Sequence, residues 1–215
     1  VVVSMSFTDP DVSARVMTGP APELLAAATA RTVTAWRRAR GQQTPAPLLA
    51  LETHGRADAV VSAGLADDAH LIDTGDTVGL LSAIYPVRLV DGVLPVIPGD
   101  GIDYALLRHL RADTAERLGA HRDPQVLLNY LGRIHHAGGA QALLPDRALL
   151  AALSPTPEPN LAVRHELTRT VALIERNGVP VLCSQWRILP AIMAAADVPT
   201  LQAIWQGALR RAASA

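Results

Sequence analysis

Several residue types that mark particular classes of protein are scarce or missing in this chain of 215 residues. Lysine is absent, so all 19 basic residues are arginines, and 20 acidic residues bring the formal net charge to -1. A chain this close to neutrality offers no basic surface for nucleic acid, so we expect no nucleic-acid partner. We attribute the bias toward arginine and alanine to a GC-rich genome rather than to chemistry.

Sulfur and long apolar runs are also limited. The one cysteine, Cys183, cannot form a disulfide within the chain, which fits a reducing, cytoplasmic setting, and its apolar neighbours predict a buried side chain. No apolar run approaches the ~20 residues of a transmembrane helix, so we expect no membrane partner. Residues 1–5 have no charge and no cleavage site, which argues against a signal peptide, and they read like a strand of a longer chain.

Apolar side chains are plentiful by comparison. Hydrophobic residues make up 49% of the chain and charged residues 18%, which excludes a disordered tail and allows one domain or two small lobes. Because aromatic residues make up only 3%, we expect a mainly aliphatic core.

Strand-like and helix-like segments alternate along the chain, which predicts the α/β class. Helices are expected from residues 8–11 onward, over 20–40 and 102–110, and over 191–213 with an interruption near Pro199. The last two expected strands are joined near Asn177-Gly178. The full set of expected strands covers residues 1–7, 48–51, 77–89, 125–131, 161–173 and 179–186.

An acid, an imidazole and a guanidinium group follow the second of these strands, at Glu52, His54 and Arg56. Side chains alternate along an extended segment, so the three are expected to share one face at the end of an apolar strand. One interpretation is a poised general base. The other, which the pattern alone favours, is a solvated salt bridge at the strand end.

Other catalytic and metal-binding patterns are weak or absent in the sequence. The pair His135-His136 has no Cys, Asp or Glu at zinc-ligand spacing, so we predict a loop position and no metal. Residues 98–101 read as a turn, and the chain has no P-loop, dinucleotide fingerprint or Gly-x-Ser-x-Gly elbow. A Ser-His-Asp triad stays open, because its members can lie far apart in sequence.

Four segments carry more specific patterns: residues 52–57 (ETHGRA), 76–89 (DTVGLLSAIYPVRL), 98–105 (PGDGIDYA) and 128–133 (LNYLGR). In the same order and at similar spacing they resemble EGHGRE, RTVGWFTxxYPxxL, PxxGxGYG and FNYLGR, motifs of the epimerization domains of nonribosomal peptide synthetases. The final strand pair and helix also follow that family, so the resemblance extends over nearly the whole chain.

The resemblance implies a fold and a place within it. Such domains belong to the condensation superfamily, in which two chloramphenicol-acetyltransferase-like lobes form a V around a tunnel. Residues 1–215 would be a single domain, the C-terminal lobe, built as a two-layer sandwich of a mixed sheet with helices. The N-terminal lobe with its HHxxxDG motif is then missing, since His135-His136 is not followed by the required Asp and Gly.

The resemblance also implies a reaction: conversion of a carrier-bound aminoacyl or peptidyl thioester from the L to the D form. Glu52 would face the second histidine of the missing motif across the tunnel, Arg56 would orient Glu52 or hold negative charge, and His54 would support them. Asn129 and Tyr130 would line the site. On a regular strand those two point to opposite faces, so one supports structure unless the strand bulges.

Several positions depart from the family pattern. Thr53 and Asp103 replace glycines, Ala57 replaces a glutamate, and Leu80-Leu81 replaces Trp-Phe. These changes bear on carrier docking and tunnel shape more than on the acid and base. Two alternatives therefore stay open: a lobe of a condensation or acyltransferase domain, and a degenerate, non-catalytic lobe that docks a carrier.

The expected partners follow from the same resemblance. The substrate would arrive on the 4'-phosphopantetheine of a peptidyl carrier protein, with no cofactor bound directly by this chain. The missing lobe is the second partner, without which the fragment is expected to be inactive. An exposed lobe interface also predicts a homodimer.

Overall fold

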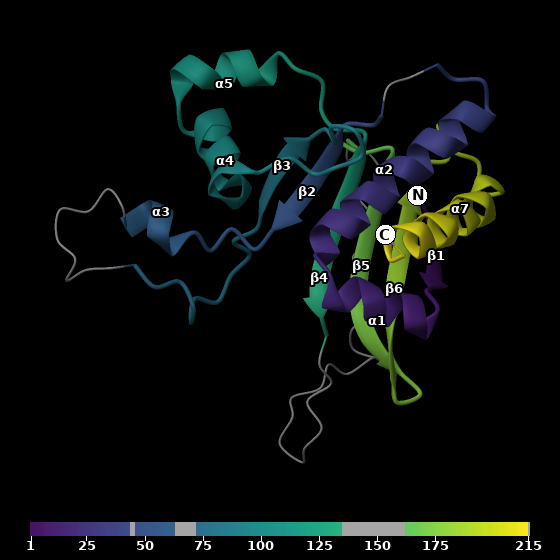
Figure 1. The fold of residues 1–215 in the computed structure, drawn as a ribbon. Coiled ribbons are helices and arrows are strands. Elements are labelled where there is room, and N and C mark those ends of the chain that lie inside the picture. Colours follow the sequence, from purple (N-terminus) through teal and green to yellow (C-terminus); the bar gives the residue numbers. More distant parts are fainter. Residues whose placement is uncertain (44–45, 63–71, 135–161, 215) are drawn as a thin grey trace.

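A computed structural model of the chain describes residues 1–43, 46–62, 72–134 and 162–214. The strands in these ranges form one mixed sheet in the order β1-β6-β5-β4-β2-β3 (Figure 1). The β2–β4 and β4–β5 pairs are parallel, and the β1–β6, β6–β5 and β2–β3 pairs are antiparallel. The strand bounds are β1 Val2–Phe7, β2 Leu49–Thr53, β3 Ala83–Val87, β4 Val126–Arg133, β5 Leu167–Arg176 and β6 Val179–Ile188.

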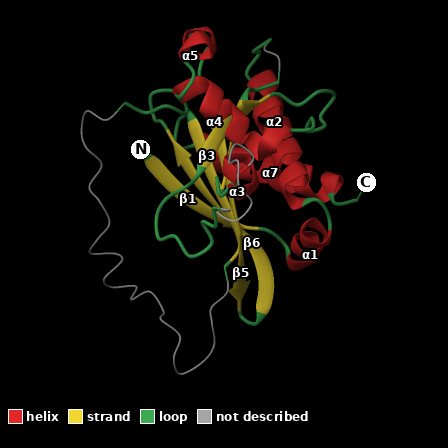
Figure 2. Cartoon of the chain, turned by 90° about the vertical axis from the view of Figure 1, so that its left-hand side faces the viewer, coloured by secondary structure: helices red, strands yellow, loops and turns green. Residues whose placement is uncertain are grey.

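Three helices cover one face of the sheet: α1 (Pro10–Thr18), α2 (Ala21–Ala39) and α7 (Asp197–Ala212) (Figures 1 and 2). A smaller group lies beyond the β3 edge: α3 (Asp58–Ser62), and η2 (Pro98–Gly101) leading into α4 (Ile102–His109) and α5 (Ala112–Gly119). The predicted two-layer α/β sandwich of a mixed sheet with helices is confirmed. Within the described ranges, no helix has the length and apolarity needed to cross a membrane.

The core lies between the sheet and the three covering helices. Leu25 of α2, Leu49 of β2 and Leu128 of β4 are at most 3% exposed, as expected for an aliphatic core. Two tryptophans nevertheless occupy its centre. Trp186 of β6 and Trp205 of α7 are fully buried, and their ring centroids lie 6.2 Å apart in an edge-to-face arrangement.

Arg169 of β5 carries a charge into this core. Its guanidinium lies 3.9 Å from the ring centroid of Trp186 and 3.4 Å from that of Trp205. One hydrogen bond, donated by Nη1 to Thr29 Oγ1, spans 3.3 Å, while Nε and Nη2 have no partner among the described residues. Complete burial lowers the pKa of Arg169 well below its usual value, because the apolar surroundings disfavour the charge.

Local sequence features account for several element ends. Asp9 caps α1 by accepting a 3.0 Å hydrogen bond from the Asp11 N–H at Oδ1, which agrees with the predicted helix start. Asn177 and Gly178 join β5 to β6, with φ of 54° and 76°. Two positive φ values match the right-handed twist of a two-residue hairpin, and Asn-Gly adopts them at low cost. The hairpin predicted near these residues is therefore confirmed.

Three predicted boundaries are wrong. The strand expected over residues 77–89 is limited to β3, where Pro86 is accommodated because β3 is an edge strand. The strand expected from residue 161 begins at Leu167 as β5. The helix expected from residue 191 begins at Asp197 as α7, and Pro199 does not interrupt it, because the N–H that proline lacks has no partner in a first helical turn.

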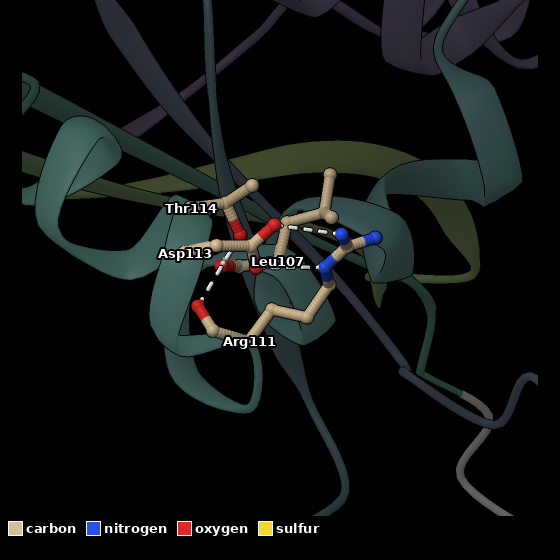
Figure 3. A network of polar contacts seen from close by, with 4 residues as sticks. All are labelled: Leu107, Arg111, Asp113 and Thr114. Carbon is tan, nitrogen blue, oxygen red and sulfur yellow. Dashed lines mark hydrogen bonds and ion pairs between the residues drawn. The ribbon is translucent and has the colours of Figure 1, made fainter.

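The turn between α4 and α5 is fixed by a small polar network (Figure 3). Thr114 Oγ1 donates to the Leu107 carbonyl at 2.6 Å and to the Arg111 carbonyl at 3.3 Å. Arg111 also donates to both carboxylate oxygens of Asp113, at 2.9 and 2.7 Å. These hydrogen bonds lower the pKa of Asp113. They satisfy groups at the end of one helix and the start of the next, so the short helices hold a defined angle.

Candidate functional site

Glu52 and Asn129 lie side by side on two central strands. In the parallel β2–β4 pair Glu52 is in register with Asn129, and Leu51 is in register with Leu128. Leu51 and Leu128 are buried against the helices. Since successive side chains alternate between the faces of a strand, Glu52 and Asn129 point to the other, uncovered face. Both are partly buried there.

The same register line continues across the sheet. Asn129 is in register with Thr170 of β5, and Thr170 with Gln185 of β6. Four polar side chains thus form a row on the uncovered face, led by the carboxylate of Glu52. The neighbouring strand β1 adds apolar side chains to that face, since Val3 is 54% exposed and Met5 49%.

The extended chain that carries Glu52 ends at Thr53 because Gly55 turns it. Gly55 has φ of 63°, and a Cβ at this position would lie 1.8 Å from the Leu81 carbonyl oxygen. Only glycine allows both the left-handed conformation and the close approach. The face that Glu52, His54 and Arg56 were expected to share therefore does not extend beyond β2.

His54 and Arg56 take part in the turn and the loop behind it. His54 Nδ1 accepts a 3.0 Å hydrogen bond from the Arg56 N–H. The Arg56 guanidinium donates to the carbonyl oxygens of Thr74 and Thr77, the latter at 2.9 Å from Nη2. Among the described residues it forms no ion pair with Glu52, so neither the expected strand-end salt bridge nor direct orientation of Glu52 by Arg56 is observed.

Asp58 fixes the same loop from α3. Its Oδ1 accepts a 2.7 Å hydrogen bond from the Thr74 hydroxyl, and its Oδ2 accepts one of 3.2 Å from the Thr74 N–H. The bond from the hydroxyl lowers the pKa of Asp58 most, followed by the bond from the backbone. Sequence reasoning missed Asp58, because a single acid in a short helix carries no pattern.

Tyr130 occupies the face opposite Asn129. It packs against the core under the helices, and burial raises the pKa of its hydroxyl. The β4–β5 register shifts only after Tyr130, near Gly132, which has φ of 68°. The bulge thus begins too late to bring Asn129 and Tyr130 to one face, and Tyr130 takes the supporting position that regular alternation predicts.

A cavity of about 480 Å³ lies beside the Glu52 row. Its lining includes Ala50 and Ile84, which alternation and register place on the same face as Glu52, and also Arg108 of α4 and His165. His165 Nδ1 lies 2.9 Å from the Pro124 carbonyl oxygen, which only accepts, so Nδ1 carries the proton and Nε2 is left as an acceptor. Nothing in the local sequence singled out these residues.

The remaining sequence candidates lie elsewhere. His135-His136 falls outside the described residues. Cys183 is buried, as predicted, and desolvation raises the pKa of its thiol. No group of three or more His, Cys, Asp or Glu residues in the described ranges is arranged to hold a metal ion.

Comparison with known proteins relates the sequence to large multidomain synthetases. No protein-family model matches the chain. A stretch of 138 residues, 57% of the chain, is 30% identical to a linear gramicidin synthase of Brevibacillus parabrevis. A stretch of 100 residues, 40% of the chain, is 33% identical to bacitracin synthase 2 of Bacillus licheniformis. The matches span only 2% and 3% of those proteins.

The fold is found in solved structures. The epimerization domain from the third module of tyrocidine synthetase B matches 99% of this chain over 48% of its own length, with a TM-score of 0.67 and 17% identity. A chloramphenicol acetyltransferase matches 97% of this chain over 87% of its own length, with a TM-score of 0.51 and 11% identity. This chain therefore has the chloramphenicol-acetyltransferase-like fold of one lobe of a condensation-superfamily domain, and it is similar in sequence to nonribosomal peptide synthetases.

Proposed function

We propose that the chain is the C-terminal lobe of an epimerization domain, in which a carrier-bound L-aminoacyl or peptidyl thioester is converted to the D form. The observation that supports this most directly is the register of Glu52 with Asn129 on the uncovered face of the sheet. Both residues belong to segments that resemble epimerization motifs.

The reaction needs a base on one side of the Cα atom and an acid on the other. The base takes the Cα proton, and the electron pair of the C–H bond moves into the thioester carbonyl to give an enolate. A proton then returns to Cα from the opposite face while the carbonyl re-forms, so nothing is gained or lost overall. Glu52 supplies one of these two groups, and the histidine of the N-terminal lobe supplies the other.

Asn129 is suited to hold the substrate beside Glu52. Its amide has two N–H donors, which can bind the Glu52 carboxylate or the enolate oxygen as negative charge develops there. Arg56 and His54 act as positioning residues, because they fix the turn after β2 and the loop over Thr74 to Thr77. Tyr130 supports the strand from the core side.

The partners follow from this reaction. A peptidyl carrier protein brings the thioester on its 4'-phosphopantetheine arm, in the cytoplasm, and no cofactor is held by this chain itself. The N-terminal lobe completes the site, so the chain alone is inactive. When that lobe is absent, the exposed apolar side chains of β1 are free to pair with a second copy of this chain.

Exchange of the α-proton in heavy water tests the proposal. An aminoacyl carrier protein is incubated with the chain alone, with a protein extended by an N-terminal lobe, and with Glu52→Gln in the extended protein. We expect exchange only in the extended protein and its loss in the Glu52→Gln variant. Glu175→Gln is the matched control, because Glu175 is an exposed glutamate at the far end of β5.

The alternatives give different results in the same assay. Formation of an amide product without exchange would assign the lobe to a condensation domain. Neither exchange nor product, with the carrier still bound, would leave a docking lobe. Loss of exchange in the Glu175→Gln control would show that the Glu52→Gln result reflects damage to the fold.

A further inference from the structure

Four arginines line one cavity of about 610 Å³, which we name the arginine cavity. Arg37 and Arg40 come from the end of α2, Arg88 follows β3, and Arg122 precedes β4. The only acid in its described lining is Glu166. This concentration of positive charge stands out in a chain whose formal net charge is -1.

The topology brings these segments together at one edge of the sheet. β2, β4 and β5 are parallel, so their N-terminal ends share an edge, and β3 ends there because it runs antiparallel to β2. In Figure 1 this is the upper edge, which α2 also reaches with its C-terminal end. Glu52 lies at the other end of β2, about 10 Å from Leu49 at ~3.3 Å per residue. The arginine cavity is therefore distinct from the proposed active site.

The charges in the cavity are only partly compensated. Arg37 Nη2 lies 3.4 Å from Glu166 Oε2, and Arg40 Nη1 lies 3.0 Å from Asp197 Oδ1. Arg88 donates to the Ala46 carbonyl, which is neutral. Within the described ranges neither Arg88 nor Arg122 forms an ion pair, so two guanidinium charges remain to attract an anion.

A purely structural role explains only half of this arrangement. Cations at a helix C-terminus complement the helix dipole, which accounts for Arg37 and Arg40. Arg88 and Arg122 lie on connections outside α2 and gain nothing from its dipole. Three glutamines add further N–H donors to the lining, namely Gln42, Gln43 and Gln125.

We infer that the arginine cavity binds a small ligand through a diphosphate group. Guanidinium groups donate pairs of hydrogen bonds that fit phosphate oxygens, and a diphosphate presents enough of these for two arginines at once. A volume of about 610 Å³ suits a small molecule, whereas a protein partner would need a broad, flat surface. This inference does not depend on the proposed epimerization, because it concerns the opposite end of the strands.

Isothermal titration calorimetry with inorganic pyrophosphate, at constant ionic strength, tests the inference. We expect saturable binding that the double variant Arg88→Gln/Arg122→Gln weakens at least about tenfold, the loss expected for one charge-assisted hydrogen bond or more. Single variants at the two positions should each give a partial loss. Arg187→Gln/Arg210→Gln is the control, since both arginines are exposed and lie outside the cavity lining.

Two further probes show what the cavity recognises. A nucleoside diphosphate that binds as tightly as pyrophosphate supports recognition of the phosphates alone, and tighter binding shows that the nucleoside is also contacted. The inference is overturned if pyrophosphate does not bind, if the control variant loses as much affinity as the cavity variant, or if an acidic peptide binds through Arg88 and Arg122 while pyrophosphate does not. Circular dichroism melting confirms that each variant is folded.

Discussion

Arg169 shows how a single residue can oppose the folding of the sheet that contains it. Its charge is removed from water, one hydrogen bond reaches Thr29, and the faces of Trp186 and Trp205 supply the remaining attraction. Attraction to aromatic faces offsets a few kcal/mol at most, whereas an unpaired buried cation costs several kcal/mol. The balance therefore favours an apolar side chain of similar length at this position.

We predict that Arg169→Met leaves the free energy of unfolding unchanged or raises it by about 1 kcal/mol. The methionine fills the same space between the tryptophans without a charge or unpaired N–H groups. Urea denaturation measures the change. Trp205→Ala is the comparison, because it opens a cavity under Arg169 and should lower the stability by about 3–5 kcal/mol. A loss of more than about 2 kcal/mol in Arg169→Met would contradict this account.

At the scale of elements, the turn after β2 decides where the proposed catalytic strand ends. Gly55 combines a positive φ with contact to the Leu81 backbone, and Arg56 ties the turn to Thr74. Each of these links joins β2 to a loop rather than to the carboxylate of Glu52. The position of Glu52 thus depends on the turn and on the neighbouring strands.

We predict that Gly55→Ala lowers the free energy of unfolding by more than about 2 kcal/mol, because strain from the positive φ adds to a backbone clash. Gly178→Ala separates the two effects. Gly178 has φ of 76° but open space around its Cβ position, so only the strain, about 1 kcal/mol, is expected there. Chemical denaturation of both variants measures the difference. Equal losses at the two positions would mean that contact with Leu81 has no energetic weight.

Sequence reasoning predicted those elements whose information is local. The apolar spacing along α2 and the Asn177-Gly178 turn each identify an element without knowledge of its neighbours. The short helix α5 was not predicted, since none of its residues is buried and it has no apolar stripe to reveal it. Strand pairing is also non-local: Glu52 and Asn129 are 77 residues apart, and only the assembled sheet places them in register.

At the scale of the whole molecule, the sheet is covered on one face and open on the other (Figure 2). The open face carries the polar row of Glu52 and Asn129 beside apolar side chains of β1. Alternation within a strand could predict which residues share a face, but it could not show which face the helices leave open. That choice follows from the packing of α1, α2 and α7.

We predict that the chain alone self-associates through this open face. Val3 and Met5 are 54% and 49% exposed, and burying them in a symmetric dimer removes apolar surface from water. Val3→Glu/Met5→Glu should yield a monomer, because like charges would meet across the two-fold axis. Val96→Glu, at a residue that is 96% exposed on a loop, should leave association unchanged. Sedimentation velocity across micromolar concentrations measures the outcome, and a monomeric wild-type chain, or equal effects of both substitutions, would contradict this use of the open face.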